Sequence, residues 1–311
     1  MNMSEVAHFF SKEQFGNVVE AKPFRMGMSG ASVYDVTTER GSYVLRVASP
    51  HTQNWERQMA VLRLVSDNAI APRILFMDSA ARATISDKIP GTGLIGAMGD
   101  PNTRGPAIMS LVDTLAKMHT IPASDIVATD PMSVVGELWR AQSVRAGFPE
   151  WAGKIGKTFG AIEAILATDE RRVLSHNDLN PGNVLWDGNR AWLIDFEASA
   201  RIHPYYDLAG FTLFLSLPLE SALGLLAKQE AAAISQEQAV VFECLRRVAA
   251  ALYGMIFLSL VPDLQAIPVT TLEETGTLND CYALHSAGKV PLQSAAGQGG
   301  MAKAFLKLAM T

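Results

Sequence analysis

The chain has 311 residues, of which 49% are hydrophobic and 18% are charged, and its formal net charge is −5. This balance indicates a soluble globular protein and excludes a disordered tail. A mildly acidic chain has no positive field to attract DNA or RNA, so we expect no nucleic-acid partner. Its length exceeds the usual size of one domain, which predicts two domains or two lobes.

Three features of the sequence bear on location. Residues 1–16 have no basic region ahead of an apolar core, unlike a secretory signal. The longest uncharged run, Val248 to Pro262, is shorter than the roughly 20 apolar residues that span a bilayer, so we interpret it as a buried helix. The two cysteines, Cys244 and Cys281, lack CxxC spacing. We therefore predict a cytoplasmic protein with no membrane partner, no disulfide framework and no zinc site.

Short segments with strand character dominate the first part of the chain. Ser32 to Thr38 and Ser42 to Ala48 predict two strands joined by a tight turn. Apolar residues at helical spacing follow over 54–66, and two further strand-like runs come before residue 90. We predict a small antiparallel sheet with one helix, which together form an N-terminal nucleotide-binding lobe of residues 1–89.

The second part of the chain has mainly helical periodicity. Residues 90–106 are rich in Gly and Pro and predict a connector between lobes. Three short strand-like runs between residues 171 and 195 form the exception, with an Asp-Gly hairpin signal at 187–188. Ser294 to Gly300 predicts a flexible link before a short final helix. The predicted fold class is α+β, with a larger, mainly helical catalytic and substrate-binding lobe of residues 90–311 that carries a β insert.

The segment HNDLNPGN, from His176 to Asn183, and the following WLIDFE contain the clearest chemical pattern. Alone, each polar residue would be an ordinary turn residue. Phosphoryl transfer from ATP, however, needs Mg²⁺ held by hard oxygen ligands and a carboxylate that accepts the proton of the attacking hydroxyl. Asn183 and Asp195 offer such oxygens, and Asp178 lies on the same loop as Asn183. We predict Asp178 as the catalytic base and Asn183 and Asp195 as Mg²⁺ ligands.

A family resemblance follows from this segment. The pattern H-x-D-x-x-x-x-N, followed by a strand that ends in D-F, is shared by protein kinases and their small-molecule relatives. Residues 175–209, which end in YYDLA, resemble the aminoglycoside phosphotransferase and choline kinase superfamily. The resemblance implies a bilobal protein-kinase-like fold that uses ATP and Mg²⁺. It also implies that His176 braces the catalytic loop and that Asp207 hydrogen-bonds the backbone of this loop.

The nucleotide is expected in the N-terminal lobe. The segment Gly27 to Tyr34 can form a tight turn whose N–H groups face phosphates. Where the family often has Lys, the third strand has Arg46, which can bind phosphate or a carboxylate through two donors. Glu56 is the predicted partner of Arg46, and the connector after the last strand corresponds to the family's adenine-binding segment. The candidate nucleotide-binding residues are Ser29, Gly30, Ser32, Arg46, Glu56, Ser86 and Lys88.

The predicted acceptor is a small hydroxylated molecule. A protein acceptor is disfavoured because DFEAS lacks the glycine of D-F-G and YYDLA follows too soon for an activation segment. H-N-D together with D-F-E is typical of choline kinases and their bacterial relatives, whereas aminoglycoside phosphotransferases usually have H-G-D. We predict a cationic amino alcohol such as choline or ethanolamine, with Glu197 and Phe211 as candidate contacts that supply negative charge and an aromatic face.

Several alternatives stay open. After Asp207 no acidic residue occurs before Glu220, which argues against choline itself. An aminoglycoside phosphotransferase, an antibiotic-resistance enzyme, is the second alternative. Its polycationic acceptor would favour a strongly acidic C-terminal lobe, whereas Val248 to Thr311 has only four acidic residues. Thiamine, homoserine and sugars are further possible acceptors. A kinase-like protein that binds nucleotide without catalysis is a hypothesis of another class, motivated by Arg46 in place of Lys.

Overall fold

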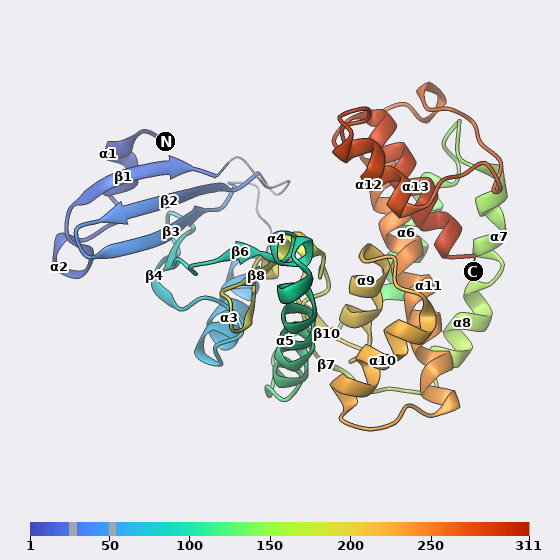
Figure 1. Ribbon diagram of the computed structural model, residues 1–311, viewed down its shortest axis with the longest axis horizontal. Coiled ribbons are helices and arrows are strands. Elements are labelled where there is room, and N and C mark those ends of the chain that lie inside the picture. Colours follow the sequence, from blue (N-terminus) through green and yellow to red (C-terminus); the bar gives the residue numbers. More distant parts are fainter. Residues whose placement is uncertain (25–29, 50–53, 311) are drawn as a thin grey trace. The chain divides into compact units, whose positions relative to one another are not determined.

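The computed structural model describes residues 1–24, 30–49 and 54–310 (Figure 1). The chain packs into two compact units, one made of Met1–Met118 and Gly182–Ser199, the other of His119–Pro181 and Ala200–Thr311. The chain therefore passes from one unit to the other inside the HNDLNPGN motif. This division by packing differs from the functional boundary at residue 90, which stays a prediction.

An antiparallel sheet is the frame of the first unit and has the strand order β1-β2-β3-β5-β4 (Figure 1). Its strands are β1 (Val18–Pro23), β2 (Ser32–Thr38), β3 (Gly41–Val47), β4 (Ile74–Asp78) and β5 (Ala83–Asp87). Side chains along β2 alternate between buried and more exposed positions, as a strand with one covered face requires. Tyr34 and Val36 pack with Phe10 and Phe15 from the helical N-terminal segment, which contains α1 (Met3–Ala7) and α2 (Lys12–Phe15). The predicted sheet and the bounds of its β2 strand are confirmed.

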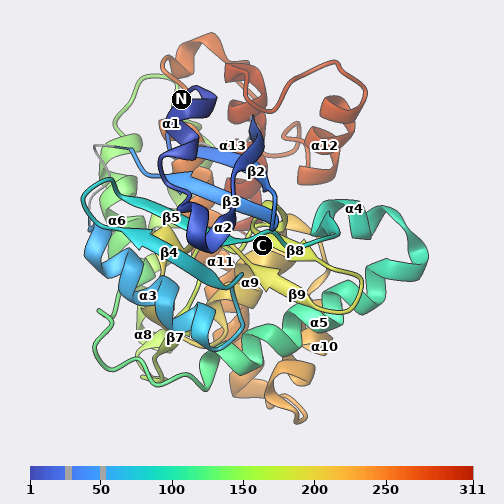
Figure 2. The same ribbon diagram turned by 90° about the vertical axis from the view of Figure 1, so that its left-hand side faces the viewer.

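The predicted helix over 54–66 is α3 (Trp55–Asp67), which lies beside β4 (Figure 2). Trp55 and Met59 are buried there against Met77 of β4. The first unit is completed by β6 (Thr92–Gly93), α4 (Leu94–Gly99), α5 (Pro101–His119), β8 (Val184–Trp186), β9 (Ala191–Leu193) and the short 3₁₀ helix η3 (Phe196–Ala198).

The Gly- and Pro-rich segment 90–106, predicted as a connector between lobes, contains β6, α4 and the start of α5, and its role as a connector stays a prediction. The glycines serve close packing here. Gly91 has a φ of 125°, and a side chain at this position would place its Cβ 2.9 Å from Cα of Asp187. The segment thereby pairs with β8, while Ser110 of α5 accepts the N–H of Ala191 at 2.9 Å. These contacts position the β8–β9 hairpin, between the two predicted metal ligands.

The second unit is mainly helical, with α11 at its centre (Figure 1). Its elements are α6 (Pro131–Gln142), η1 (Glu150–Ala152), α7 (Gly153–Gly156), α8 (Phe159–Leu166), β7 (Val173–Ser175), β10 (Ala200–Ile202), α9 (Tyr206–Phe214), α10 (Leu219–Glu230), α11 (Gln236–Ser259), η4 (Leu264–Ala266), α12 (Leu278–Ser286) and α13 (Ala295–Leu308), and η2 (Pro181–Asn183) spans the unit boundary. The apolar run that begins at Val248 is the buried second half of α11, as predicted. Within the described ranges, no helix combines the length and the hydropathy that a membrane crossing needs.

The glycine-rich stretch from Ser294 to Gly300 is not a flexible link. Ser294 caps the N-terminus of α13, and the helix runs through Gly297 and Gly299. A Cβ at Gly299 would lie 2.7 Å from Cδ1 of Ile267, and one at Gly297 would overlap the carbonyl oxygen of Pro291. The glycines therefore allow close packing around this helix, a reason that local composition does not reveal.

Candidate active site

The loop that carries Asp178 leaves the end of β7 through a tight turn. Asn177 has a φ of 67°, a left-handed conformation that asparagine tolerates better than most residues. The N–H of Asp178 points to Nδ1 of His176 at 3.4 Å, and the N–H of Asn180 donates to the carbonyl oxygen of Asp178 at 2.9 Å. These local bonds turn the backbone sharply on both sides of Asp178.

The carboxylate of Asp207 holds this loop from the first turn of α9. Its Oδ2 accepts the N–H of His176 at 2.7 Å, and its Oδ1 accepts the N–H of Asn177 at 2.8 Å. Asp207 is 2% exposed and His176 is 0% exposed. Burial raises the pKa of Asp207, while His176 and the two N–H groups favour the charged form. The structure thus contains the contact that the family resemblance implies, and the catalytic role of the loop stays a prediction.

Two tyrosines near Asp178 were not predicted as site residues. Burial raises the pKa of Tyr206, and the charges of Asp207 and Asp178 raise it further. The pKa of Tyr253 lies well above its ordinary value for the same reasons. Both phenols therefore stay protonated around the carboxylate. Tyr206 belongs to the YYDLA motif, but the sequence around Tyr253, in the middle of α11, carries no local signal of this proximity.

The predicted metal ligands flank the β8–β9 hairpin. Val184 pairs with Leu193, so Asn183 directly precedes one strand and Asp195 lies just beyond the end of the other. The N–H of Ile194 donates to the carbonyl oxygen of Asn183 at 3.0 Å, which closes this end of the hairpin. Asp195 has a φ of 66°, another left-handed position.

This donor set fits Mg²⁺. Among the described residues, no three His, Cys, Asp or Glu side chains gather as a self-sufficient metal site. Mg²⁺ in nucleotide enzymes is usually held by one or two protein oxygens together with phosphates and water, so it needs no larger cluster. Asn183 and Asp195 provide one amide oxygen and one carboxylate.

Arg46 has a different ion-pair partner from the predicted one. Its guanidinium pairs with the carboxylate of Glu197, which η3 places two residues after Asp195. Burial lowers the pKa of Arg46, an effect that the charge of Asp195 partly opposes. Glu56 is exposed in the first turn of α3, and no ion pair joins it to Arg46 in the part of the chain that the structure describes. The carboxylate that pairs with Arg46 therefore comes from the segment that follows the β8–β9 hairpin, and not from α3 as predicted.

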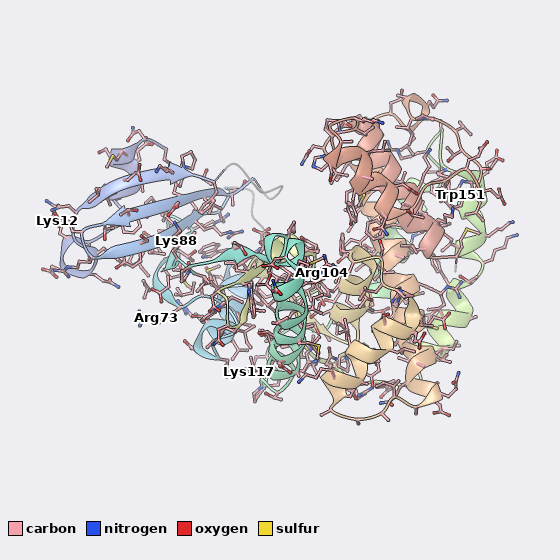
Figure 3. All side chains as sticks on the ribbon, viewed as in Figure 1. Lys12, Arg73, Lys88, Arg104, Lys117 and Trp151 are labelled. Carbon is pink, nitrogen blue, oxygen red and sulfur yellow. The ribbon has the colours of Figure 1, made fainter. Side chains whose placement is uncertain are left out.

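The other candidate nucleotide-binding residues lie on or next to the sheet, apart from Ser29, which is outside the described residues. Gly30 has a φ of 71°, and Ser32 begins β2 opposite Val47. Ser86 lies on β5, and Nζ of Lys88 donates to Oδ2 of Asp35 at 2.6 Å (Figure 3). Their contact with a nucleotide stays a prediction.

The aromatic candidate for the acceptor, Phe211, lies in the second unit, which contains other aromatic side chains. Phe211 is 0% exposed in α9, so this structure offers no open ring face there, and its contact with substrate stays a prediction. Phe214 packs against Tyr253 with ring centroids 4.7 Å apart. Trp151 donates from Nε1 to the carbonyl oxygen of Thr270 at 3.0 Å (Figure 3).

Comparison with known proteins places this arrangement in a family. The model of the phosphotransferase enzyme family matches residues 20–241, well over half of the chain. The chain belongs to the phosphotransferase enzyme family. This match confirms the predicted superfamily of aminoglycoside phosphotransferases and choline kinases, whose members are kinase-like phosphotransferases. No curated protein matches this phosphotransferase in sequence.

Solved structures confirm the predicted kinase-like fold of the phosphotransferase. A choline/ethanolamine kinase family protein from Mesorhizobium loti is 16% identical with a TM-score of 0.67, over 91% of this chain and 92% of that chain. Choline kinase from Streptococcus pneumoniae is 14% identical with a TM-score of 0.66, over 97% and 98%. An aminoglycoside phosphotransferase in a ternary complex with AMP-PNP and hygromycin B is 17% identical with a TM-score of 0.59, over 98% of both chains.

Proposed function

We propose that this phosphotransferase transfers the terminal phosphoryl group of ATP, in the presence of Mg²⁺, to a hydroxyl of choline, ethanolamine or a related amino alcohol. One observation carries the proposal. The buried carboxylate of Asp207 accepts the N–H groups of His176 and Asn177 at 2.7 and 2.8 Å, so it fixes the backbone directly before Asp178. A general base must be held in a defined orientation, and this contact supplies the support.

The chain's own residues then have separate tasks. Asp178 accepts the proton of the acceptor hydroxyl as that oxygen attacks the phosphorus atom. The raised pKa values of Tyr206 and Tyr253 keep both phenols protonated within the electrostatic field of Asp178. Asn183 and Asp195 would hold Mg²⁺, which when bound neutralises charge on the phosphate oxygens. The sheet residues Gly30, Ser32, Arg46, Ser86 and Lys88 would contact the nucleotide, together with Ser29 and Glu56.

Two observations support an amino alcohol as the acceptor. The motif has H-N-D and D-F-E, the form typical of choline kinases, and two of the structural relatives are choline or ethanolamine kinases. One relative was determined in complex with AMP. An aminoglycoside acceptor is the second candidate, because one relative holds AMP-PNP and hygromycin B. A non-catalytic nucleotide-binding protein is disfavoured because Asp178, Asn183 and Asp195 are all present.

The test is consumption of Mg-ATP by the purified protein with choline, ethanolamine, thiamine, homoserine, sugars and aminoglycosides as separate acceptors. We expect turnover with an amino alcohol and a loss of at least about 100-fold in Asp178→Asn, since general base catalysis contributes 10²–10⁴-fold. Asp187→Asn, in the turn of the β8–β9 hairpin, is the matched control. Equal rates for Asp178→Asn and the wild type would refute the assigned base, and turnover with aminoglycosides alone would replace the proposed acceptor.

A further inference from the structure

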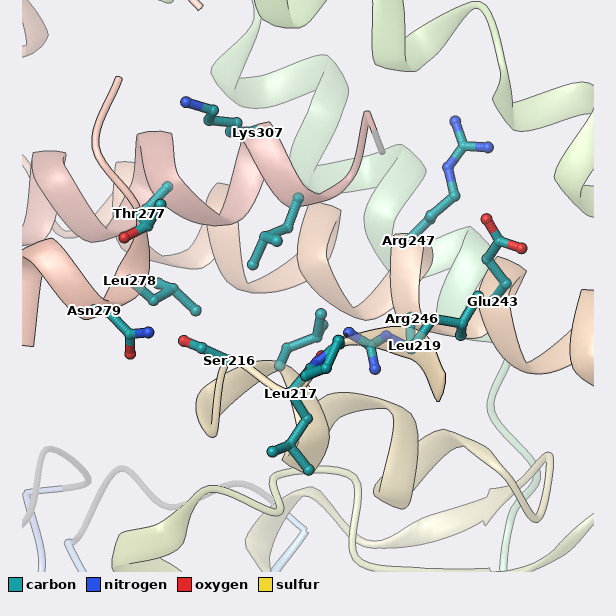
Figure 4. Close-up of a pocket in the computed structure, with 14 residues that line it drawn as sticks. Ser216, Leu217, Leu219, Glu243, Arg246, Arg247, Thr277, Leu278, Asn279 and Lys307 are labelled. Atoms are coloured by element: carbon teal, nitrogen blue, oxygen red, sulfur yellow. Dashed lines mark hydrogen bonds between the residues drawn. The ribbon is translucent and has the colours of Figure 1, made fainter. Parts of the chain in front are cut away.

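A cavity of about 520 Å³ lies within the second unit (Figure 4). It is lined by the end of α9, the start of α10, the middle of α11, the start of α12 and the end of α13. The volume is typical of small-molecule sites. None of the residues predicted for catalysis or nucleotide binding lines it. Its apolar wall contains Leu213, Leu217, Leu219, Leu278 and Leu308.

The polar part of the lining has an excess of positive charge. The lining contains three cations, Arg246, Arg247 and Lys307, and one carboxylate, that of Glu243. In Figure 4, Glu243 and Arg247 lie together at one end of the lining, whereas Ser216 and Asn279 lie at the other. No ion pair joins Glu243 to any of the three cations in the described part of the chain. This local excess runs against the overall net charge of −5, so it is not a general property of the surface.

Arg246 is the cation with the most informative surroundings. Its Nη1 donates to Oγ1 of Thr212 at 3.2 Å, and its Nη2 donates to the carbonyl oxygen of Leu217 at 2.8 Å. Both acceptors are neutral. Burial lowers the pKa of Arg246, and the charge of Glu243 only partly opposes this effect. A partly buried guanidinium with five N–H donors and two neutral acceptors has both donors and charge left for an anion.

The two other cations are held in the same way. Nε of Arg247 donates to the carbonyl oxygen of Ala309 at 3.1 Å, and Nζ of Lys307 donates to that of Thr275 at 2.6 Å. Neutral carbonyl groups therefore orient all three cations, and the charge of Lys307 also helps to lower the pKa of Asp280 outside the lining. A guanidinium fork matches the two oxygens of a carboxylate, and such charge-assisted bonds are the strong ones.

We propose that this cavity binds a small organic anion, with a carboxylate on Arg246 and an apolar body against the leucine side chains. Binding at this site does not depend on the proposed function, and a bound anion that is phosphorylated would replace the amino alcohol proposed as acceptor. Two sources share this chemistry: an acceptor that carries both a hydroxyl and a carboxylate, and an effector that does not react.

The experiment is titration calorimetry of the full chain with hexanoate, hexylammonium and hexanol, which have equal chain length and differ in the charge of the head. We expect hexanoate to bind with a dissociation constant of about 1 mM or lower, at least about tenfold tighter than hexylammonium or hexanol. Arg246→Gln should weaken hexanoate binding at least about tenfold. Arg140→Gln, an exposed arginine on α6, is the matched control and should bind as the wild type does.

A second variant keeps the test valid should Arg246→Gln fold poorly. Leu219→Trp adds bulk to the apolar wall and retains all three cations, and it should also abolish hexanoate binding. The proposal is overturned by absence of hexanoate binding to the wild type, by equally tight hexylammonium binding, or by full hexanoate affinity in both cavity variants.

Two further measurements show whether the bound anion is a phosphate acceptor or an effector. They also keep the test of anion binding separate from the test of kinase activity. 6-Hydroxyhexanoate with Mg-ATP yields ADP and a phosphorylated product if the bound anion is an acceptor, and binds without turnover if it resembles an effector. Asp178→Asn should bind hexanoate as tightly as the wild type in either case, because Asp178 does not line the cavity. A failure of the assigned base would therefore leave this site intact.

Discussion

Replacement of Asp207 tests how the catalytic loop is held. Its carboxylate accepts two backbone N–H groups at 2.7 and 2.8 Å and is 2% exposed. Hydrogen bonds to a charged group contribute about 1.5–3 kcal/mol each, so the pair contributes about 3–6 kcal/mol. Burial of the carboxylate opposes these bonds and raises the pKa of Asp207, so the expected loss lies toward the lower part of this range. We expect Asp207→Ala to lower the free energy of unfolding by about 2–4 kcal/mol, with two N–H groups left without an acceptor.

Asp207→Asn removes the negative charge of the side chain and keeps its size and shape. The amide oxygen can replace one carboxylate oxygen, but the amide N–H₂ faces the second backbone donor, so about 1–3 kcal/mol should be lost. Urea unfolding gives the stability, provided that the slope m is unchanged. We also expect kcat to fall more than KM rises, because the loop that bears Asp178 loses its orientation.

Asp187→Asn is the matched control for this experiment. Asp187 accepts the N–H groups of Asn189 and Arg190 at 2.8 and 2.7 Å and the indole N–H of Trp192, but it lies in a more exposed hairpin turn. The control should lose about 1 kcal/mol or less. The reasoning is refuted if Asp207→Asn has the urea midpoint and the kcat of the wild type, or if both variants lose the same stability.

Two further predictions concern charge. Burial, helped by the charge of His203, lowers the pKa of His119 from 6.5 to about 4. The contribution of His119 to stability is therefore present above pH 6.5 and is lost as the pH falls toward 4. Thermal melts over this range should show a flatter pH dependence of stability in His119→Phe than in the wild type, and an unchanged slope would contradict this prediction. A double-mutant cycle of Arg46→Met with Glu197→Gln should give a coupling of about 1 kcal/mol in unfolding free energy, because the pair is partly exposed, and zero coupling would dismiss the ion pair as a stabilising contact.

The local chemistry of the sequence was sufficient for several features. The strand character of Ser32–Thr38 and the turn after it predicted β2 with its observed bounds. The segment that contains Asp178, Asn183 and Asp195 resembles the phosphotransferase superfamily, and the family model confirms this resemblance. Local composition failed at Ser294–Gly300, where close packing rather than flexibility explains the glycines.

Contacts between distant segments were decided by the tertiary structure alone. No spacing in the sequence brings Tyr253 into the electrostatic field of Asp178, pairs Arg46 with Glu197 instead of Glu56, or gathers Arg246, Arg247 and Lys307 around one cavity. Such contacts depend on which faces of separate helices and hairpins are buried against each other, and the hydrophobic pattern of one element does not specify its partner. The sequence by itself therefore determined the reaction class that we propose, whereas the packing of α9, α11 and α13 decided the surroundings of the catalytic loop and the charge of the cavity.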